Sequence, residues 1–317
     1  HRSFIDNSHN IRYNKGIVSK LRDIGGICMR YRIITDSTGD LTPELIRDLQ
    51  LTVIPMEFTI DGKSYRNYPD GHEMSAKAFY HLLRAGKTST TAQINAHEFM
   101  DWADPILQAG EDILYLAFSS GLSGTCQSAY MAKEELSARY PDRKIYVVDS
   151  LAASMGEGLL AYYASKMQLE GKTIDEVYQW LQDNKLHLCH WFTVDDLNHL
   201  KRGGRVSSAA ALFGTMLGIK PVLHVDDAGH LIPVAKIRGR RQSLDSLVAH
   251  MEQTVTNPEE QVIFISHGDC EKDAQYVADQ IRAKWNVKEI VLNEIGPVIG
   301  THSGPGTVAL FFLGSKR

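Results

Sequence analysis

Apolar and polar positions follow one another along the chain in a pattern that predicts strands and helices in turn from residue 31 onward. Short apolar runs indicate buried strands, and apolar residues repeated every three or four positions indicate amphipathic helices. In the first half these two patterns alternate, which is typical of a parallel sheet whose strands are joined by helices. The predicted strands are 31–35, 52–60, 113–117 and 145–148, and the predicted helices are 43–51, 75–85, 95–109, 126–138, 155–170 and 174–184.

The pattern changes near residue 185, where we place a domain boundary. Strands 220–225 and 230–237 enclose a turn and predict an antiparallel hairpin. The other predicted elements of this half are strands 186–194, 262–266, 289–294 and 308–313 and helices 195–200, 207–217, 243–255 and 271–285. The fold class is therefore α/β with two domains. Residues 29–185 form a mostly parallel, Rossmann-like sheet with a small hairpin flap at Asp61-Gly62, and residues 186–317 form a mixed or antiparallel sheet.

The first 28 residues differ from the rest of the chain. They are polar and weakly periodic, and glycines at 16, 25 and 26 interrupt them. Met29 directly precedes the first predicted strand. We expect residues 1–28 to be an N-terminal extension that does not belong to the native protein, with a genuine N-terminal arm as the alternative.

Composition and charge exclude several classes of protein. Hydrophobic residues make up 43% and charged residues 23% of the chain, and the formal net charge is -4, so nothing suggests a nucleic-acid partner. The four cysteines lie far apart without a CxxC pair, which argues against a disulfide framework or a zinc knuckle and fits a reducing cytosol. No apolar run approaches the roughly 18 residues of a membrane span. We expect a cytoplasmic protein.

Small hydroxyl and acidic side chains follow three predicted strands, at Asp36-Ser37-Thr38, Ser119-Ser120 and Asp149-Ser150. Ligands of open parallel sheets bind beyond the carboxyl ends of the strands. The stretch 118–125 also carries two glycines before a predicted helix, and the amino end of a helix can hold an anion or a carbonyl group. The alternative is that these residues only cap helices.

A second unusual stretch, 296–306, contains four glycines and two prolines around His302 and predicts an irregular loop. A histidine held between Thr301 and Ser303 in such a loop is a candidate for a binding site. Two basic clusters, one at 201–205 and one at 236–241, are candidates for a patch that binds phosphate or an acidic partner, or for a solvated surface.

Several familiar motifs are absent. The segment Gly86-Lys87-Thr88 lacks the upstream glycine of a phosphate-binding loop, because His81 stands in its place. No GxSxG or HExxH pattern occurs. His187, Cys189 and His190 do not make a metal site, because residues 187 and 189 of a strand face away from residue 190.

Six stretches, taken in this order, resemble the DegV family over residues 29–314. They are ITDSTGD at 34–40, KTS at 87–89, SSGLSGT at 119–125, VDS at 148–150, LKRGGRVS at 200–207 and GPVIGTHSGPG at 296–306. The resemblance implies a two-domain α/β protein that binds one long-chain fatty acid, such as palmitate, stearate or oleate, in a buried tunnel. It further implies a non-catalytic, lipid-carrying subunit of bacterial fatty acid kinase, whose catalytic subunit converts the carboxylate to an acyl-phosphate.

The resemblance also implies a set of site residues. The carboxylate would be held by Thr88 or Ser89, by Ser119 or Ser120, and by His302. Arg202 and Arg205 would face the kinase, no other cofactor would be needed, and transient contact with a membrane surface would be expected. After residues 87–89 many members continue Gln-Pro, whereas this chain continues Thr-Thr-Ala-Gln.

The chemistry of these residues agrees with a fatty-acid site. A buried carboxylate is costly unless several donors satisfy it, and hydroxyl groups, backbone N–H groups and an imidazole are such donors. The apolar run 209–217 is a candidate wall of the tunnel. The alternative function is an autonomous serine-dependent hydrolase or phosphotransferase that uses a serine of the 118–125 stretch with His302.

Overall fold

A computed structural model of the chain describes residues 30–207 and 218–317. The unit Tyr31–Arg317 is compact. The predicted extension 1–28, the proposed start at Met29, and nearly all of the predicted helix 207–217 with its candidate tunnel wall lie outside the described residues. Within the described part of the chain, no helix is both long enough and apolar enough to cross a membrane.

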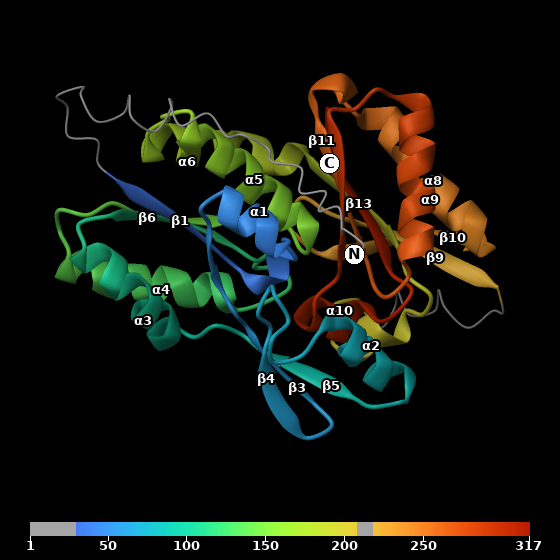
Figure 1. Ribbon diagram of the computed structural model, residues 1–317, viewed down its shortest axis with the longest axis horizontal. Helices are drawn as coiled ribbons and strands as arrows, with labels where there is room; N and C mark the ends of the chain where they lie inside the picture. Colours follow the sequence, from blue (N-terminus) through green and yellow to red (C-terminus); the bar gives the residue numbers. More distant parts are fainter. Residues whose placement is uncertain (1–29, 208–217) are drawn as a thin grey trace, which may run out of the picture. The chain divides into compact units, whose positions relative to one another are not determined.

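The first half of the chain builds a parallel sheet of four strands in the order β2-β1-β6-β7 (Figure 1). The strands are β1 (Tyr31–Asp36), β2 (Thr52–Ile54), β6 (Asp112–Ala117) and β7 (Ile145–Asp149). All three pairings are parallel, as the alternation of strands and helices predicted.

Helices cover both faces of this sheet because apolar residues occupy both faces of its strands. Helices α3 (Ala96–Gln108) and α4 (Thr125–Arg139) lie on one side, and α5 (Met155–Leu169) and α6 (Ile174–Asn184) lie on the other (Figure 1). Ile113 and Tyr115 of β6 pack toward α3 and α4, whereas Leu114 and Leu116 pack toward α5. The short helix α1 (Pro43–Asp48) begins with the predicted proline, capped by the side chain of Thr42.

A three-stranded antiparallel sheet, in the order β4-β3-β5, forms the predicted flap. It contains β3 (Glu57–Ile60), β4 (Lys63–Arg66) and β5 (Ser89–Ala92), and α2 (Ala76–Arg84) lies between β4 and β5 in the sequence. The prediction of one strand over 52–60 is wrong, because Pro55 and Met56 separate β2 from β3 and the two strands join different sheets. No strand was predicted for the hydroxyl-rich segment 87–91, but β5 pairs with β3 from Ser89 onward.

The second half builds a mixed sheet of six strands in the order β10-β9-β8-β13-β11-β12. Its strands are β8 (Leu188–Thr193), β9 (Ile219–Val225), β10 (Leu231–Arg238), β11 (Val262–His267), β12 (Glu289–Glu294) and β13 (Val308–Leu313). Only β11 and β12 pair in parallel, and β9 and β10 form the predicted hairpin. The mixed sheet is therefore confirmed.

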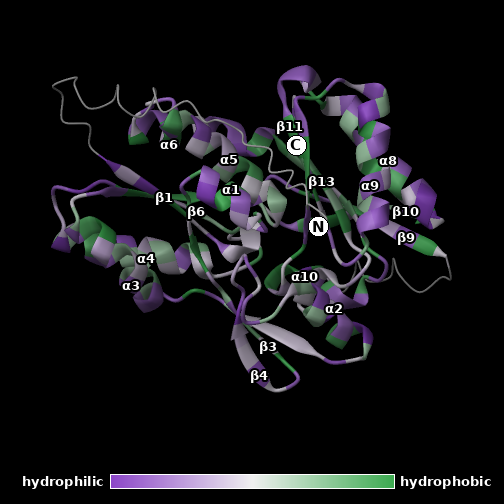
Figure 2. Cartoon of the chain, viewed as in Figure 1, coloured by the Kyte–Doolittle hydropathy of each residue, from purple (hydrophilic) through white to green (hydrophobic). Residues whose placement is uncertain are grey.

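Helices α8 (Arg240–Thr254) and α9 (Glu271–Lys284) cover one face of the mixed sheet. Their other sides are mainly hydrophilic, whereas strands β11 and β13 are strongly hydrophobic (Figure 2). The opposite face of the sheet packs against α5, so residues of both sheets share one hydrophobic core. The boundary predicted near residue 185 falls between α6 and β8, at the 3-10 turn Lys185–His187, and stays a prediction.

The stretch 296–306 is largely helical, which corrects the predicted irregular loop. Helix α10 (Pro297–Ser303) begins with Pro297, a residue whose fixed φ suits the first turn of a helix. Gly300 leaves room for Tyr80 and Phe79, which a side chain at this position would meet at less than 3 Å. Gly304, with φ of 77°, then ends the helix. Three short elements remain: helix α7 (Asn198–Arg202) and the 3-10 turns Ser37–Gly39 and Pro258–Glu260.

Candidate functional site

A cavity of about 450 Å³ lies where α10, β8, β13 and the turn 118–124 approach one another. Its walls also include residues of β5, of the β9–β10 hairpin and of the segment before α5. We call this space the main cavity. Its volume falls within the range of roughly 300–1,000 Å³ that small-molecule sites occupy.

The body of the main cavity is apolar. Alternate residues of β8 and β13 face it, because successive side chains of a strand point to opposite sides of the sheet. The apolar lining comes from elements far apart in the sequence: Met56, Phe118, Leu122, Phe192, Leu200, Val225, Leu231, Ile295, Val298, Ile299, Ala309 and Phe311. Such a space suits a molecule with an extended apolar part.

A second space of about 440 Å³, which we call the polar pocket, adjoins the main cavity. It is lined mainly by hydroxyl and basic side chains: Lys87, Thr88, Ser89, Thr90, His199, Arg202 and Thr301. Thr91, Arg205 and His302 line both spaces. These three residues therefore mark the place where an apolar ligand body would meet a polar group.

His302 stands in the last turn of α10, with its Nε2 atom 2.9 Å from Oγ1 of Thr91. Burial, together with the nearby Arg205, lowers the pKa of His302 from 6.5 to about 4. The imidazole is therefore neutral at pH 7. Its Nδ1 atom is buried without a hydrogen-bond partner among the described residues and lies against Gly203, where a side chain would collide with it.

The pairing of Thr91 with His302 leaves one hydrogen-bond donor in excess. A neutral imidazole carries one N–H, the threonine carries one O–H, and the bond between them uses only one of these two. If the imidazole donates, the Thr91 hydroxyl can donate elsewhere. A donor at the junction of the two spaces is suited to an anionic oxygen.

Ser89 and Thr88 lie beside this junction, on the side of the polar pocket. The Ser89 hydroxyl is 2.7 Å from that of Thr301, which itself donates to the carbonyl of Pro297 at 2.8 Å. Ser89 therefore ties β5 to α10, and Thr88 is exposed. Thr91, which the sequence analysis did not select, shares the face of β5 that carries Ser89. Reading the segment as a strand would have found it.

Ser119 and Ser120 are not among the residues that line either space. The buried Ser119 hydroxyl donates to the carbonyl of Gly229 at 2.9 Å and accepts from the Gly121 N–H at 3.2 Å. Ser120 is exposed, and its backbone N–H donates to Asp149. The serine of this turn that lines the main cavity is Ser123, because the turn bends back toward the start of α4 after Gly121.

The two arginines occupy different settings. Arg202 is exposed, and its Nη2 atom lies 3.0 Å from Nδ1 of His199. Arg205 is partly buried, donates to the backbone carbonyls of Leu122 and Gly203, and lines both spaces. Burial lowers the pKa of Arg205, but the guanidinium stays charged. Arg205 therefore contributes positive charge to the junction itself.

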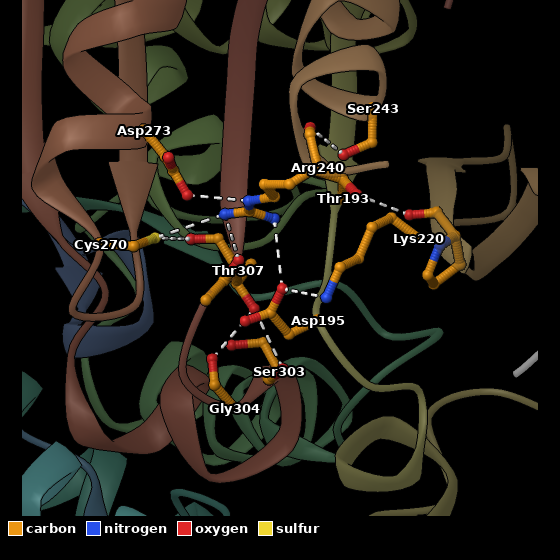
Figure 3. Close-up of polar contacts among 12 residues, drawn as sticks. Thr193, Asp195, Lys220, Arg240, Ser243, Cys270, Asp273, Ser303, Gly304 and Thr307 are labelled. Carbon is orange, nitrogen blue, oxygen red and sulfur yellow. Dashed lines mark hydrogen bonds and ion pairs between the residues drawn. The ribbon is translucent and has the colours of Figure 1, made fainter. Parts of the chain in front are cut away.

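An ion-pair network anchors the segment that follows α10 (Figure 3). Arg240 donates to Asp273 at 2.8 Å and to the Gly306 carbonyl at 2.7 Å, and it lies 3.7 Å from Asp195. Lys220 holds Asp195 from the other side at 2.7 Å. The network thereby fixes the backbone that carries Ser303 and Thr307 to the wall of the main cavity. The adjoining Cys270 thiol is protonated, because burial raises its pKa to about 12.

The acidic end of β1 takes part in a separate buried network. Asp36 accepts from Tyr115, and Glu157 of α5 accepts from Thr35 and Thr38. Burial raises the pKa of both carboxyl groups, and the nearby Asp36 raises the pKa of Glu157 further. Among residues 30–207 and 218–317, no three histidine, cysteine, aspartate or glutamate side chains are grouped as a metal site requires.

The fold and the cavity define an α/β protein with two main sheets and a small three-stranded flap, whose largely apolar cavity ends in a basic, hydroxyl-rich pocket. A family profile described as "Uncharacterised protein, DegV family" matches residues 30–315, and the chain belongs to the DegV family. It is 48% identical over 288 residues to a DegV domain-containing protein of Clostridium perfringens, covering 91% of this chain and 99% of that protein.

Solved structures of the same family share the fold. A DegV lipid binding protein from Thermotoga maritima superposes with a TM-score of 0.80 at 29% identity, covering 91% of this chain and 100% of that one. The structure described as fatty acid binding of a DegV family protein from Thermus thermophilus gives a TM-score of 0.81 at 29% identity, covering 89% and 99%. The α/β fold expected from the sequence is thus confirmed.

Proposed function

We propose that this protein binds one long-chain fatty acid, with the acyl chain in the main cavity and the carboxylate at the junction with the polar pocket. The observation that carries the proposal is the apolar cavity of about 450 Å³ that ends on the Thr91–His302 pair. The fatty-acid and lipid binding described for its structural relatives supports the same conclusion. Burial of an acyl chain contributes about 0.8 kcal/mol per CH₂ group, so binding should be tight.

At the junction, we assign the carboxylate to His302 and Thr91, with Ser123 as a further hydroxyl of the main-cavity lining and the charge of Arg205 nearby. Several donors are needed because a buried carboxylate loses the hydrogen bonds of water. Thr88 and Ser89 belong to this assignment as neighbours in the polar pocket, and Ser89 supports α10 through Thr301. Ser119 and Ser120 have an indirect role in this assignment, because their hydrogen bonds hold the turn that carries Ser123.

We further propose that the polar pocket is where a fatty acid kinase reaches the carboxylate. The pocket carries Lys87 and Arg202 beside the shared Arg205, and such groups stabilise the charge of a phosphoryl group. Arg202 is exposed at this pocket and is available to a partner protein. In this reading the chain is a carrier, and the kinase supplies the phosphoryl group.

A serine-dependent hydrolase is less well supported. It would require a serine hydroxyl of the 118–125 stretch to lie within hydrogen-bonding reach of His302. Ser119 donates to the Gly229 carbonyl, Ser120 is exposed and outside the main cavity, and the Ser123 hydroxyl pairs with that of Thr125 at 3.0 Å. The hydroxyl partner of His302 is Thr91. The Nδ1 atom of His302 has no carboxylate beside it in the described residues, so the imidazole lacks the group that orients a catalytic base.

The proposal is tested by titrating the delipidated protein with stearate and with stearyl alcohol. The two ligands share their apolar chain, but only stearate has a carboxylate. We expect stearate to bind at one site at least tenfold more tightly, and the substitution His302→Ala to reduce this difference while the melting temperature stays within a few degrees. Equal affinity for the two ligands, or no binding of either, would contradict the proposal.

A further inference from the structure

His190 is a polar residue in the apolar part of the main cavity. It lies on β8, is 2% exposed and lines the cavity beside Phe192 and Phe311. Its ring meets that of Phe311 edge-on, with centroids 5.5 Å apart. Among the described residues, neither ring nitrogen has a hydrogen-bond partner.

The other polar residues of this strand have a different environment. Cys189 and Trp191 point to the opposite face of the sheet, where Trp191 stacks on His250 of α8. His190 instead faces the cavity, opposite Gly156 of α5. Any side chain at position 156 would collide with the Nε2 edge of the imidazole, so a glycine is needed to accommodate the ring.

The imidazole is uncharged in this setting. Burial is the main reason that the pKa of His190 lies well below its usual range, and Arg317 and His224 lower it further. A contact with the backbone of Leu188 acts weakly in the opposite direction. A neutral imidazole presents one donor and one acceptor, so it matches a group that can both accept and donate, such as a hydroxyl.

The position of His190 along the sheet separates it from the carboxylate site. Its partner across the strands is Phe311, four residues beyond Thr307, and Thr307 contacts Ser303 at the end of α10. Four residues of a strand span roughly 13 Å. His190 is therefore placed to meet the acyl chain well away from the carboxylate.

We propose that His190 makes the cavity selective for fatty acids that carry a hydroxyl group along the middle or distal part of the acyl chain. This inference rests on the proposed function, because it assumes that the acyl chain occupies the main cavity. A buried polar group is almost always hydrogen-bonded, and a residue with only a packing role at this position would be satisfied by leucine or phenylalanine. An oxygen on the acyl chain supplies the missing hydrogen-bond partner of His190. The oxygen in turn avoids the cost of being buried without a hydrogen bond.

The test compares three ligands: stearate, stearate hydroxylated in the middle of the chain, and stearate hydroxylated on the carbon next to the carboxyl group. For the unaltered protein we expect the mid-chain hydroxystearate to bind at least as tightly as stearate. In the variant His190→Leu its affinity should fall about tenfold, which corresponds to about 1.4 kcal/mol. Stearate should bind the variant equally well or better, and the ligand hydroxylated next to the carboxyl group should respond as stearate does.

His190→Gln is the matched variant, since an amide keeps a donor and an acceptor and should retain most of the preference. The imidazole nitrogen resonances of His190 should shift on binding of mid-chain hydroxystearate and not of stearate, a change that a packing role does not cause. If stearate binds but mid-chain hydroxystearate does not, or if His190→Leu weakens all three ligands equally, the inference fails and the proposed function stands. If none of the ligands binds the unaltered protein, the proposed function itself fails.

Discussion

At the scale of single residues, Thr91 and Ser123 carry the proposed contacts with the carboxylate. Thr91→Val keeps the shape of the side chain and removes the hydroxyl, so we expect stearate affinity to fall about tenfold or more, as for a hydrogen bond to a charged group. Ser123→Ala should also weaken binding, although it removes a contact to the Thr125 N–H and should lower stability slightly. Isothermal titration of each variant measures the effect.

Ser120→Ala is the matched control, because Ser120 belongs to the same turn but is exposed and outside the main cavity. Its stearate affinity should stay within about twofold of the unaltered protein. If stearate affinity fell strongly in Ser120→Ala and not in Ser123→Ala, Ser120 would contact the carboxylate, as the family resemblance implies for Ser119 or Ser120.

Arg202 is the exposed arginine of the polar pocket. Arg202→Ala should leave stearate affinity unchanged and slow phosphorylation of the bound acid when a cognate fatty acid kinase and ATP are added. Lys201→Ala, an exposed neighbour outside both spaces, is the control for loss of surface charge. Loss of lipid binding in Arg202→Ala would show that this side chain serves the ligand and not the partner.

Sequence motifs pointed to regions that the fold brings together. Five residues named from the sequence or from the family resemblance line the polar pocket: Thr88, Ser89, Arg202, Arg205 and His302. Their role toward a carboxylate stays a prediction. The sequence alone does not show which of several neighbouring hydroxyl groups lines the main cavity. Which of them faces the cavity depends on the strand register of β5 and on the path of the turn 119–124.

At the scale of secondary-structure elements, the turn 118–124 meets the tip of the β9–β10 hairpin. The Ser119 hydroxyl donates to the Gly229 carbonyl, and a side chain at Gly121 would collide with the Ala228 and Gly229 carbonyls. Ser119→Ala should lower the free energy of unfolding by about 1 kcal/mol through loss of a buried hydrogen bond. Urea denaturation measures this change.

The same variant should change stearate affinity only slightly, because Ser119 does not line the main cavity. If Ser119→Ala instead abolished binding and left stability unchanged, a direct contact with the ligand would be indicated. Gly229 leaves no room for a side chain against Ser119 and Leu151, so substitution there should disturb the same junction more strongly.

Elements with a strong local signal were predicted closely, and those set by tertiary packing were not. Strands β12 and β13 match their predicted bounds, and the start predicted for α6 at residue 174 is confirmed, where Thr173 and Glu176 form a capping box. Helix α10 was not predicted, because glycines usually interrupt helices. Gly300 is nevertheless required inside this helix by the close approach of Tyr80. Strand β5 was not predicted, because its apolar period is weak and its partner β3 lies beyond β4 and α2 in the sequence.

At the scale of the whole molecule, Asp40 links the turn after β1 to the second half of the chain. Its carboxylate accepts from Ser154 at 2.6 Å and from the Gly296 N–H at 2.9 Å, and its carbonyl accepts from Asn293. Burial, together with the nearby Asp36, raises the pKa of Asp40 from 3.8 to about 7. The folded protein therefore holds this proton more tightly than the unfolded chain.

Stability should accordingly fall as the pH rises through the range between these two pKa values. Protonated Asp40 contributes its full share below about pH 4, and this share is lost by about pH 7, with a slope of at most about 1.4 kcal/mol per pH unit. Asp40→Asn removes this titrating group, so the free energy of unfolding of the variant should lack this pH dependence. Relative to the unaltered protein, the variant should therefore become more stable as the pH rises from about 5 to about 7. A difference that is independent of pH would contradict the shifted pKa.

The most direct test of the account is to identify what the purified protein carries. Native mass spectrometry, followed by analysis of an organic extract, should find one long-chain fatty acid per chain, and the delipidated protein should take up one molecule of added oleate or palmitate. An extract without fatty acid, together with no uptake of either acid, would contradict the assignment of the main cavity to an acyl chain.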